Sequence, residues 1–131
     1  MTRRITLSFL FVLAALANFD CQPYKMTYPV VTGKLVVAAY CGQYIVQVLS
    51  GSIPDSGVLT KSWTNKDTDS TYTNVFRVND ICTFAAAGLA VGDTFTFTLN
   101  GIPPVQSCYT CDIVAFPEPA ASNAVTNIKP I

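Results

Sequence analysis

Two short apolar runs in the first half of the chain share one short connection. Residues 35–40 and 44–49 are rich in Val, Ile and Tyr, and only the tripeptide Cys-Gly-Gln at 41–43 separates them. Each run is too short for a globular helix, and β-branched and aromatic residues are typical of strands. The pattern therefore predicts a tight β-hairpin. Because an isolated hairpin is only marginally stable in water, other strands must cover its apolar face.

The clearest single strand lies further along the chain. Residues 94–99 alternate strictly between Thr and an apolar residue. This alternation predicts a half-buried antiparallel strand with Phe95, Phe97 and Leu99 facing inward. A shorter apolar run predicts another strand over 75–78.

The remaining elements follow from turn residues and composition. After a proline-containing turn, residues 107–116 predict a last long strand, and 125–128 predict a short closing strand. Residues 81–89 are the one stretch that the pattern allows as a helix, and Asp80 is placed to cap its first turn.

A long stretch over 61–74 is almost wholly polar. It predicts an exposed loop or an edge hairpin, and long connections in compact domains often carry function. Trp63 and Tyr72 flank its most polar part, and their rings are suited to stack on a sugar or a peptide. In the alternative that we prefer, both rings fold back over an open end of the domain.

Five to seven short strands separated by turn signals predict an all-β domain, either a small barrel or a sandwich. The sandwich would be immunoglobulin-like, because Cys41, Trp63 and the Tyr-Thr-Cys sequence at 109–111 are similar to the cysteines and core tryptophan of that fold. However, Trp63 lies too far from Cys41 and has polar neighbours.

In strand order, the chain resembles the OB-fold-like domains of small bacterial secreted proteins and lipoproteins. The resemblance rests on Gly33 and Lys34 opening a strand, on residues 41–47, on a short helix around 84–89 and on residues 91–93 opening the next strand. It implies a small antiparallel barrel of five to six strands with one short helix, mostly in proteins of unknown role.

The N-terminal 17 residues are predicted to be a signal peptide. Two arginines precede an apolar run over 5–17 that is too short to span a bilayer, and the run ends in the small-x-small sequence Ala-Leu-Ala. Cleavage there would leave a single domain, 18–131, in a secreted, periplasmic or outer-envelope location. Cys21 raises the alternative of a lipoprotein, although the Asn-Phe-Asp sequence before it departs from the lipoprotein pattern. The membrane is a predicted partner only if Cys21 is lipidated.

If the chain is exported, the other four cysteines are expected to form disulfides, because disulfides form in oxidising compartments. Cys41, Cys82, Cys108 and Cys111 make an even set, so we expect one or two bridges, each worth about 2–4 kcal/mol. Four cysteines allow three connectivities. We prefer Cys41 with Cys108 or Cys111.

Few side chains in the sequence are suited to acid–base or nucleophilic catalysis near neutral pH. The chain has no histidine, which excludes Ser-His-Asp and Cys-His catalysis and histidine-bound zinc. Glu118 is the single glutamate, and Asp67 and Asp69 lie in the polar stretch, where no apolar surroundings would desolvate one of them for acid–base catalysis. We therefore expect a non-enzymatic binding or structural domain without a metal or another cofactor.

Charge and cysteine spacing set the remaining alternatives. Without the signal peptide, six basic residues face eight acidic ones, which gives no electrostatic footprint for nucleic acid. The partner would be an unidentified protein or glycan.

One alternative function is a thiol-redox protein using the CxxC motif of Cys108 and Cys111, although the flanking residues lack the helix start that activates such thiols. Another is a subunit of a surface assembly, favoured by the apolar composition.

Overall fold

The computed structural model describes residues 28–53, 58–100, 108, 111 and 116–131. The predicted signal peptide, 1–17, and Cys21 lie outside these residues. Within them, strands and one short α-helix make up most of the regular structure. The elements in chain order are β1 (Val30–Ala39), the 3₁₀ helix η2 (Tyr40–Gly42), β2 (Gln43–Ser50), β3 (Thr60–Asn65), β4 (Ser70–Val78), α2 (Ile81–Ala86), β5 (Thr94–Asn100) and β6 (Ser122–Pro130).

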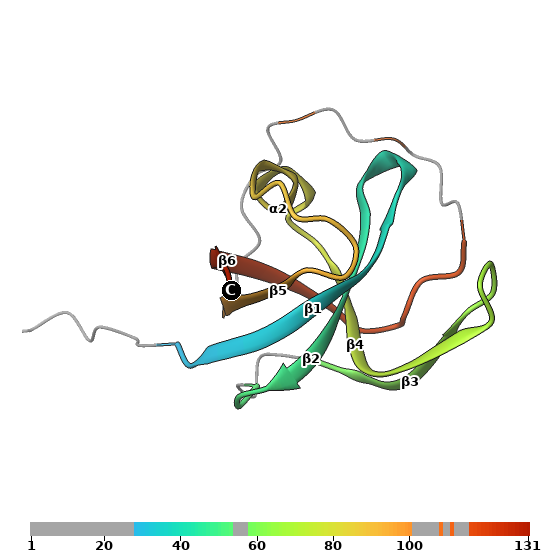
Figure 1. Ribbon diagram of the computed structural model, residues 1–131, viewed down its shortest axis with the longest axis horizontal. Helices are drawn as coiled ribbons and strands as arrows, with labels where there is room; N and C mark the ends of the chain where they lie inside the picture. The colour runs from blue at the N-terminus through green and yellow to red at the C-terminus, as the bar shows by residue number, and fades with distance from the viewer. Residues whose placement is uncertain (1–27, 54–57, 101–107, 109–110, 112–115) are drawn as a thin grey trace, which may run out of the picture.

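Five of the strands close into a ring (Figure 1). The sheet order is β2-β1-β5-β6-β4-β3, and β2 also pairs with β4, so β3 is left outside the ring. The prediction of a small all-β barrel of five to six strands with one short helix is confirmed. The expectation that all of its strands pair antiparallel was wrong, because β4 and β6 pair in parallel, at Arg77 with Ser122 and Val78 with Asn123. The strands form one continuous sheet, so the two-sheet sandwich is not the fold.

The predicted hairpin is the longest pairing in the barrel. β1 and β2 run antiparallel, with two register irregularities that bend the pair. Gly33 lies where β1 pairs with both β2 and β5. A Cβ at Gly33 would lie 2.8 Å from a ring carbon of Phe97 and 2.9 Å from Cγ1 of Val46. Only glycine therefore lets the two side chains approach the backbone at this crossing.

The interior of the ring is filled by aromatic and branched side chains. Phe95 and Phe97 are 0% exposed and Leu99 is 3% exposed, which confirms the inward face predicted for β5. Phe84 of α2 lies 5.7 Å from Phe95 between ring centroids and 4.9 Å from Tyr44. The helix thus supplies the side chain that closes one end of the barrel.

A second apolar cluster covers the outer surface of the barrel beside β3. Its buried members are Val36, Val37, Ile45, Trp63, Val75 and Phe116. This cluster explains why both faces of β2 are apolar in the sequence, since one face lines the ring and the other contacts the cluster.

Several predicted element boundaries differ from the structure. The helix ends at Ala86, and the polar stretch is the β3–β4 hairpin, as the edge-hairpin alternative proposed. Of the strand predicted over 107–116, the described residues Cys108, Cys111 and Phe116 are not in a strand, and the others lie outside the described chain. The closing strand β6 is longer than predicted, because it pairs with β5 along most of its length.

Asp80 does not cap α2 with its side chain, contrary to the prediction. Its Oδ1 instead accepts a hydrogen bond of 2.9 Å from the backbone N–H of Val125. The side chain is fully buried, and Oδ2 has no hydrogen-bond partner among the described residues. Burial raises the pKa of Asp80 above its ordinary value, and hydrogen bonds from backbone N–H groups oppose the rise. Asp80 therefore connects the start of α2 to the closing strand.

In the described residues, no helix has both the length and the apolar character needed to cross a membrane.

Candidate functional site

Two disulfides fix the segments around one end of the barrel. Cys41 is bonded to Cys111 and Cys82 to Cys108, across sequence separations of 70 and 26 residues. The Cys41–Cys111 bridge is one of the two pairings that we preferred. In the chain-entropy model, closing loops of this size stabilises a fold by roughly 3–4.5 kcal/mol per bridge. The hairpin tip and α2 are thus each tied to the segment that precedes β6.

This connectivity argues against the thiol-redox alternative. A redox cycle through the CxxC motif needs a disulfide between Cys108 and Cys111. The structure instead bonds each of them to a distant cysteine. Both sulfurs therefore serve as crosslinks in this fold.

The tip of the β1–β2 hairpin has a constrained backbone. Cys41 has φ 70° and ψ 20°, and Gly42 has φ 79°. A non-glycine residue in this left-handed region costs about 1–2 kcal/mol, and the bridge to Cys111 holds Cys41 there. A Cβ at Gly42 would collide with Cγ2 of Ile81. The tip is therefore packed directly against the first residue of α2.

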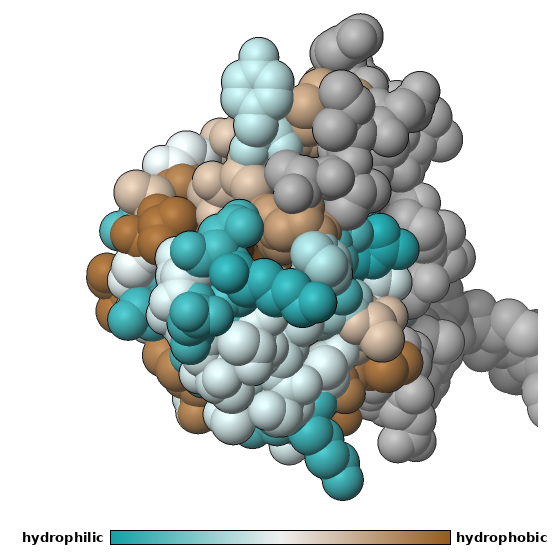
Figure 2. All heavy atoms as spheres, turned by 90° about the vertical axis from the view of Figure 1, so that its right-hand side faces the viewer, coloured by the Kyte–Doolittle hydropathy of each residue, from teal (hydrophilic) through white to brown (hydrophobic). Residues whose placement is uncertain are grey.

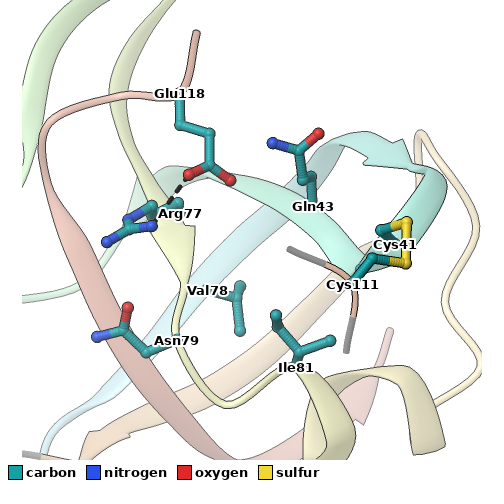
Figure 3. A pocket seen from close by; sticks show the side chains of 9 residues that line it. Cys41, Gln43, Arg77, Val78, Asn79, Ile81, Cys111 and Glu118 are labelled. Carbon is teal, nitrogen blue, oxygen red and sulfur yellow. Dashed lines mark hydrogen bonds and ion pairs between the residues drawn. A yellow bond between two sulfur atoms is a disulfide. The ribbon is translucent and has the colours of Figure 1, made fainter. Parts of the chain in front are cut away.

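A cleft of about 170 Å³ lies between this tip, the end of β4 and the start of α2 (Figure 3). We call it the Arg77 cleft. The described residues that line it are Cys41, Gly42, Gln43, Arg77, Val78, Asn79, Ile81, Cys111 and Glu118. The Cys41–Cys111 bridge forms one wall, so the cleft depends on the oxidised state of the chain.

An ion pair crosses the rim of the cleft. Nη1 of Arg77 donates to Oε2 of Glu118 at 3.0 Å. The side chains are 45% and 17% exposed, so solvent screens the pair and its contribution to stability is below about 1 kcal/mol. Its importance is local, because it places a guanidinium and a carboxylate side by side at the rim.

The rest of the lining is uncharged. Gln43 is 6% exposed and lines the cleft together with Arg77 and Glu118; Figure 3 shows the carboxylate of Glu118 directed at Arg77. Val78 and Ile81 add apolar side chains, and Asn79 adds a second amide. Among the described residues, no group of three His, Cys, Asp or Glu side chains could hold a metal ion.

Trp63 and Tyr72, the predicted ligand contacts, are packed against other side chains instead of being fully exposed. Trp63 is 9% exposed, and its ring centroid lies 6.2 Å from that of Tyr72 and 6.1 Å from that of Phe116. Its Nε1–H donates to the carbonyl oxygen of Pro117 at 3.2 Å. Tyr72 is partly buried against the same cluster. The two rings therefore pack onto the outer surface of the barrel, and we do not assign the ligand site to them.

The outer side of the β3–β4 hairpin is polar. Hydrophilic side chains gather over the hairpin on the face shown in Figure 2. Asp67 and Asp69 lie in its exposed turn, where the backbone N–H of Asp67 donates to Oδ1 of Asn65 at 2.9 Å. This surface is a solvated hairpin.

A second hollow of about 230 Å³ lies on the outer face of β1, β5 and β6, and Lys129 lines it. Two of the polar residues that line it, Thr98 and Asn127, are bonded to each other. Nδ2 of Asn127 donates to Oγ1 of Thr98 at 3.0 Å, and the hydroxyls of Thr98 and Thr126 lie 3.0 Å apart. The hollow therefore offers a ligand fewer open polar groups than the Arg77 cleft.

Sequence reasoning did not identify Arg77, Gln43 or Glu118 as partners in one site. Arg77 and Glu118 are 41 residues apart, and neither belongs to a motif of fixed spacing. The cysteines were the one available signal, because Cys41 and Cys111 bring the flanking residues together.

Comparison of the chain with protein-family models, with curated proteins and with solved structures finds no match in any of the three.

Proposed function

We propose that this chain is an exported, non-enzymatic binding domain of the cell envelope or exterior, and that its ligand contacts the Arg77 cleft. The observation that carries the proposal is the cleft itself, in which a fixed ion pair and a buried amide stand beside a disulfide wall. Concave sites with a few convergent polar groups are where ligands bind most often.

The two disulfides support an oxidising location, because such bridges persist outside the cytosol. The expected signal peptide would supply the route of export. This part is tested by expressing the full chain in a bacterial host and determining the N-terminus of the exported protein. We expect a start at Asn18, or a diacylated Cys21 if the lipoprotein alternative holds. A cytosolic protein that retains Met1 would contradict export.

The non-enzymatic role is supported by the absence of histidine from the sequence and by the placement of the acids. Asp80, whose pKa is raised, is fully buried. Glu118 is paired with Arg77 rather than with a second carboxylate. A general acid or base must reach the substrate, and neither acid is arranged for that work.

Binding at the cleft is tested on arrays of immobilised glycans and peptides. We expect Arg77→Ala to lose the signal of the wild type on its bound class. Lys129→Ala, which alters the second hollow, should keep that signal. A wild-type protein that binds nothing on either array, or an Arg77→Ala variant that binds as the wild type does, would contradict the proposal.

A subunit of a surface assembly remains the second candidate function. It is favoured by exposed apolar side chains at separate places on the described surface, including Val30 at 64%, Tyr40 at 88% and Val91 at 58% exposure. Light scattering of the purified protein separates the two functions. A monomer at micromolar concentration would contradict the assembly.

A further inference from the structure

We infer that the Arg77 cleft binds a neutral ring bearing several hydroxyl groups, that is, one sugar residue of an uncharged glycan. This inference rests on the function proposed above and names the ligand class for the same site. It comes from the hydrogen-bonding groups, the charge and the size of the cleft.

The ion pair leaves donors and an acceptor open side by side. A guanidinium carries five N–H donors, and a carboxylate accepts at both oxygens. Nη1 of Arg77 and Oε2 of Glu118 bond to each other at 3.0 Å. In the described part of the chain, the other guanidinium nitrogens and Oε1 of Glu118 make no hydrogen bond. A hydroxyl group donates and accepts at once, so two neighbouring hydroxyls on one ring match this arrangement.

The charge of the cleft favours a neutral ligand. Among the described residues that line it, Arg77 and Glu118 carry the only charges, and they are paired. A carboxylate, phosphate or sulfate that approached Arg77 would also meet the negative charge of Glu118. A cation that approached Glu118 would meet Arg77. Such like-charge contacts select against charged ligands, whereas hydroxyl groups avoid both.

The size of the cleft fits one ring. Its volume is about 170 Å³, below the roughly 300–1,000 Å³ of sites that enclose a drug-sized molecule. Val78 and Ile81 contribute apolar surface for the C–H groups of a ring, and Gln43 adds a buried amide to the lining. The site thus holds one unit of a longer ligand.

The hairpin tip offers a surface for the next unit. Tyr40 directly precedes Cys41, which lines the cleft, and its side chain is 88% exposed. The constrained backbone at Cys41 and the bridge to Cys111 hold this tip in place. An aromatic ring at such a position suits the flat face of an adjoining sugar.

The inference is tested with the exported, oxidised protein on an array that carries three classes of probe. The probes are neutral oligosaccharides of hexoses and N-acetylhexosamines, their uronic-acid and sulfated counterparts, and acidic and basic peptides. Affinity for each bound probe is then measured by calorimetry. We expect binding to neutral oligosaccharides.

Two conservative variants test the residues. Arg77→Lys keeps the charge but loses the planar set of donors, and Glu118→Gln keeps the shape but loses the charge. Because hydrogen bonds to charged groups are about twice as strong as neutral ones, we expect each variant to weaken binding about ten-fold or more. Lys129→Ala should bind as the wild type does. Intact mass and circular dichroism confirm that each variant keeps two disulfides and the native fold.

The outcomes separate the two proposals. Binding to peptides or to charged glycans alone would overturn the ligand class and leave the binding function standing. Neutral-glycan binding that Arg77→Lys and Glu118→Gln leave unchanged would overturn the assignment to this cleft. Binding to none of the probes would overturn the inference and the proposed function together.

Discussion

The indole Nε1–H of Trp63 donates a hydrogen bond to the carbonyl oxygen of Pro117 at 3.2 Å. The next residue after Pro117 is Glu118, which pairs with Arg77 at the rim of the cleft. The ring of Trp63 also packs against Phe116. One buried side chain therefore holds the segment that places the carboxylate of the candidate site.

Trp63→Phe removes this hydrogen bond and part of the buried ring. Lost packing and the unpaired carbonyl should together lower the free energy of unfolding by about 1–3 kcal/mol. We also expect weaker binding at the Arg77 cleft, because Glu118 loses its support. Urea unfolding and calorimetry measure the two effects.

Tyr72→Phe is the matched control for that variant. It keeps the ring that stacks on Trp63 and removes only a hydroxyl, so the free energy of unfolding should change by about 0.5 kcal/mol or less. Equal losses in the two variants would show that the hydrogen bond to Pro117 has no special role.

Gly42→Ala tests the packing of the hairpin tip on α2. Gly42 has a left-handed backbone, and an added Cβ would collide with Ile81. Gly88→Ala is the control, because Gly88 is also left-handed but a Cβ there would meet no atom within 4 Å. Both variants carry the backbone cost of about 1–2 kcal/mol, and overpacking should add about 1–3 kcal/mol at Gly42 alone. Thermal unfolding compares them. If Gly88→Ala is as destabilising as Gly42→Ala, the tip does not pack on α2 as described.

Asp80 makes the stability of the fold depend on pH. Burial raises the pKa of Asp80 in the folded state above its value of 3.8 in the unfolded chain. At a pH between the unfolded and the folded pKa, the folded state therefore binds more protons than the unfolded chain. The contribution of Asp80 to stability is therefore fully present below the unfolded pKa and falls as pH rises through the folded pKa.

Asp80→Asn removes this titration and keeps an acceptor for the N–H of Val125. The free energy of unfolding of the variant, relative to the wild type, should therefore rise as pH increases from about 4 to 7. Urea unfolding across that range measures the difference. A difference that is constant with pH, or that falls, would contradict the buried, destabilised carboxylate.

Much of the barrel could be predicted from local pattern. The alternation in β5 gave the inward positions of Phe95 and Phe97, because strand period and burial agree there. The hairpin of β1 and β2 was also clear, since two β-branched runs flank a turn containing Gly42. Asp80 was misassigned as a helix cap, because a contact with Val125, 45 residues away, leaves no local trace.

The candidate site could not be predicted from the sequence for the same reason, because its contacts join residues that are far apart along the chain. Trp63 has polar neighbours in the sequence, and Phe116, which packs against it, lies in a segment far along the chain. Arg77 and Glu118 meet only because the ring closes and the segment before β6 crosses near the end of β4. The sequence contained the cysteines that fix this crossing, but it did not determine their pairing.

The most direct test of the account is disulfide mapping of the exported protein by mass spectrometry of a non-reduced proteolytic digest. We predict the linked peptides Cys41–Cys111 and Cys82–Cys108, with no free thiol among these four cysteines. A bridge between Cys108 and Cys111, or unbonded cysteines in the exported protein, would remove the wall of the Arg77 cleft and contradict the account.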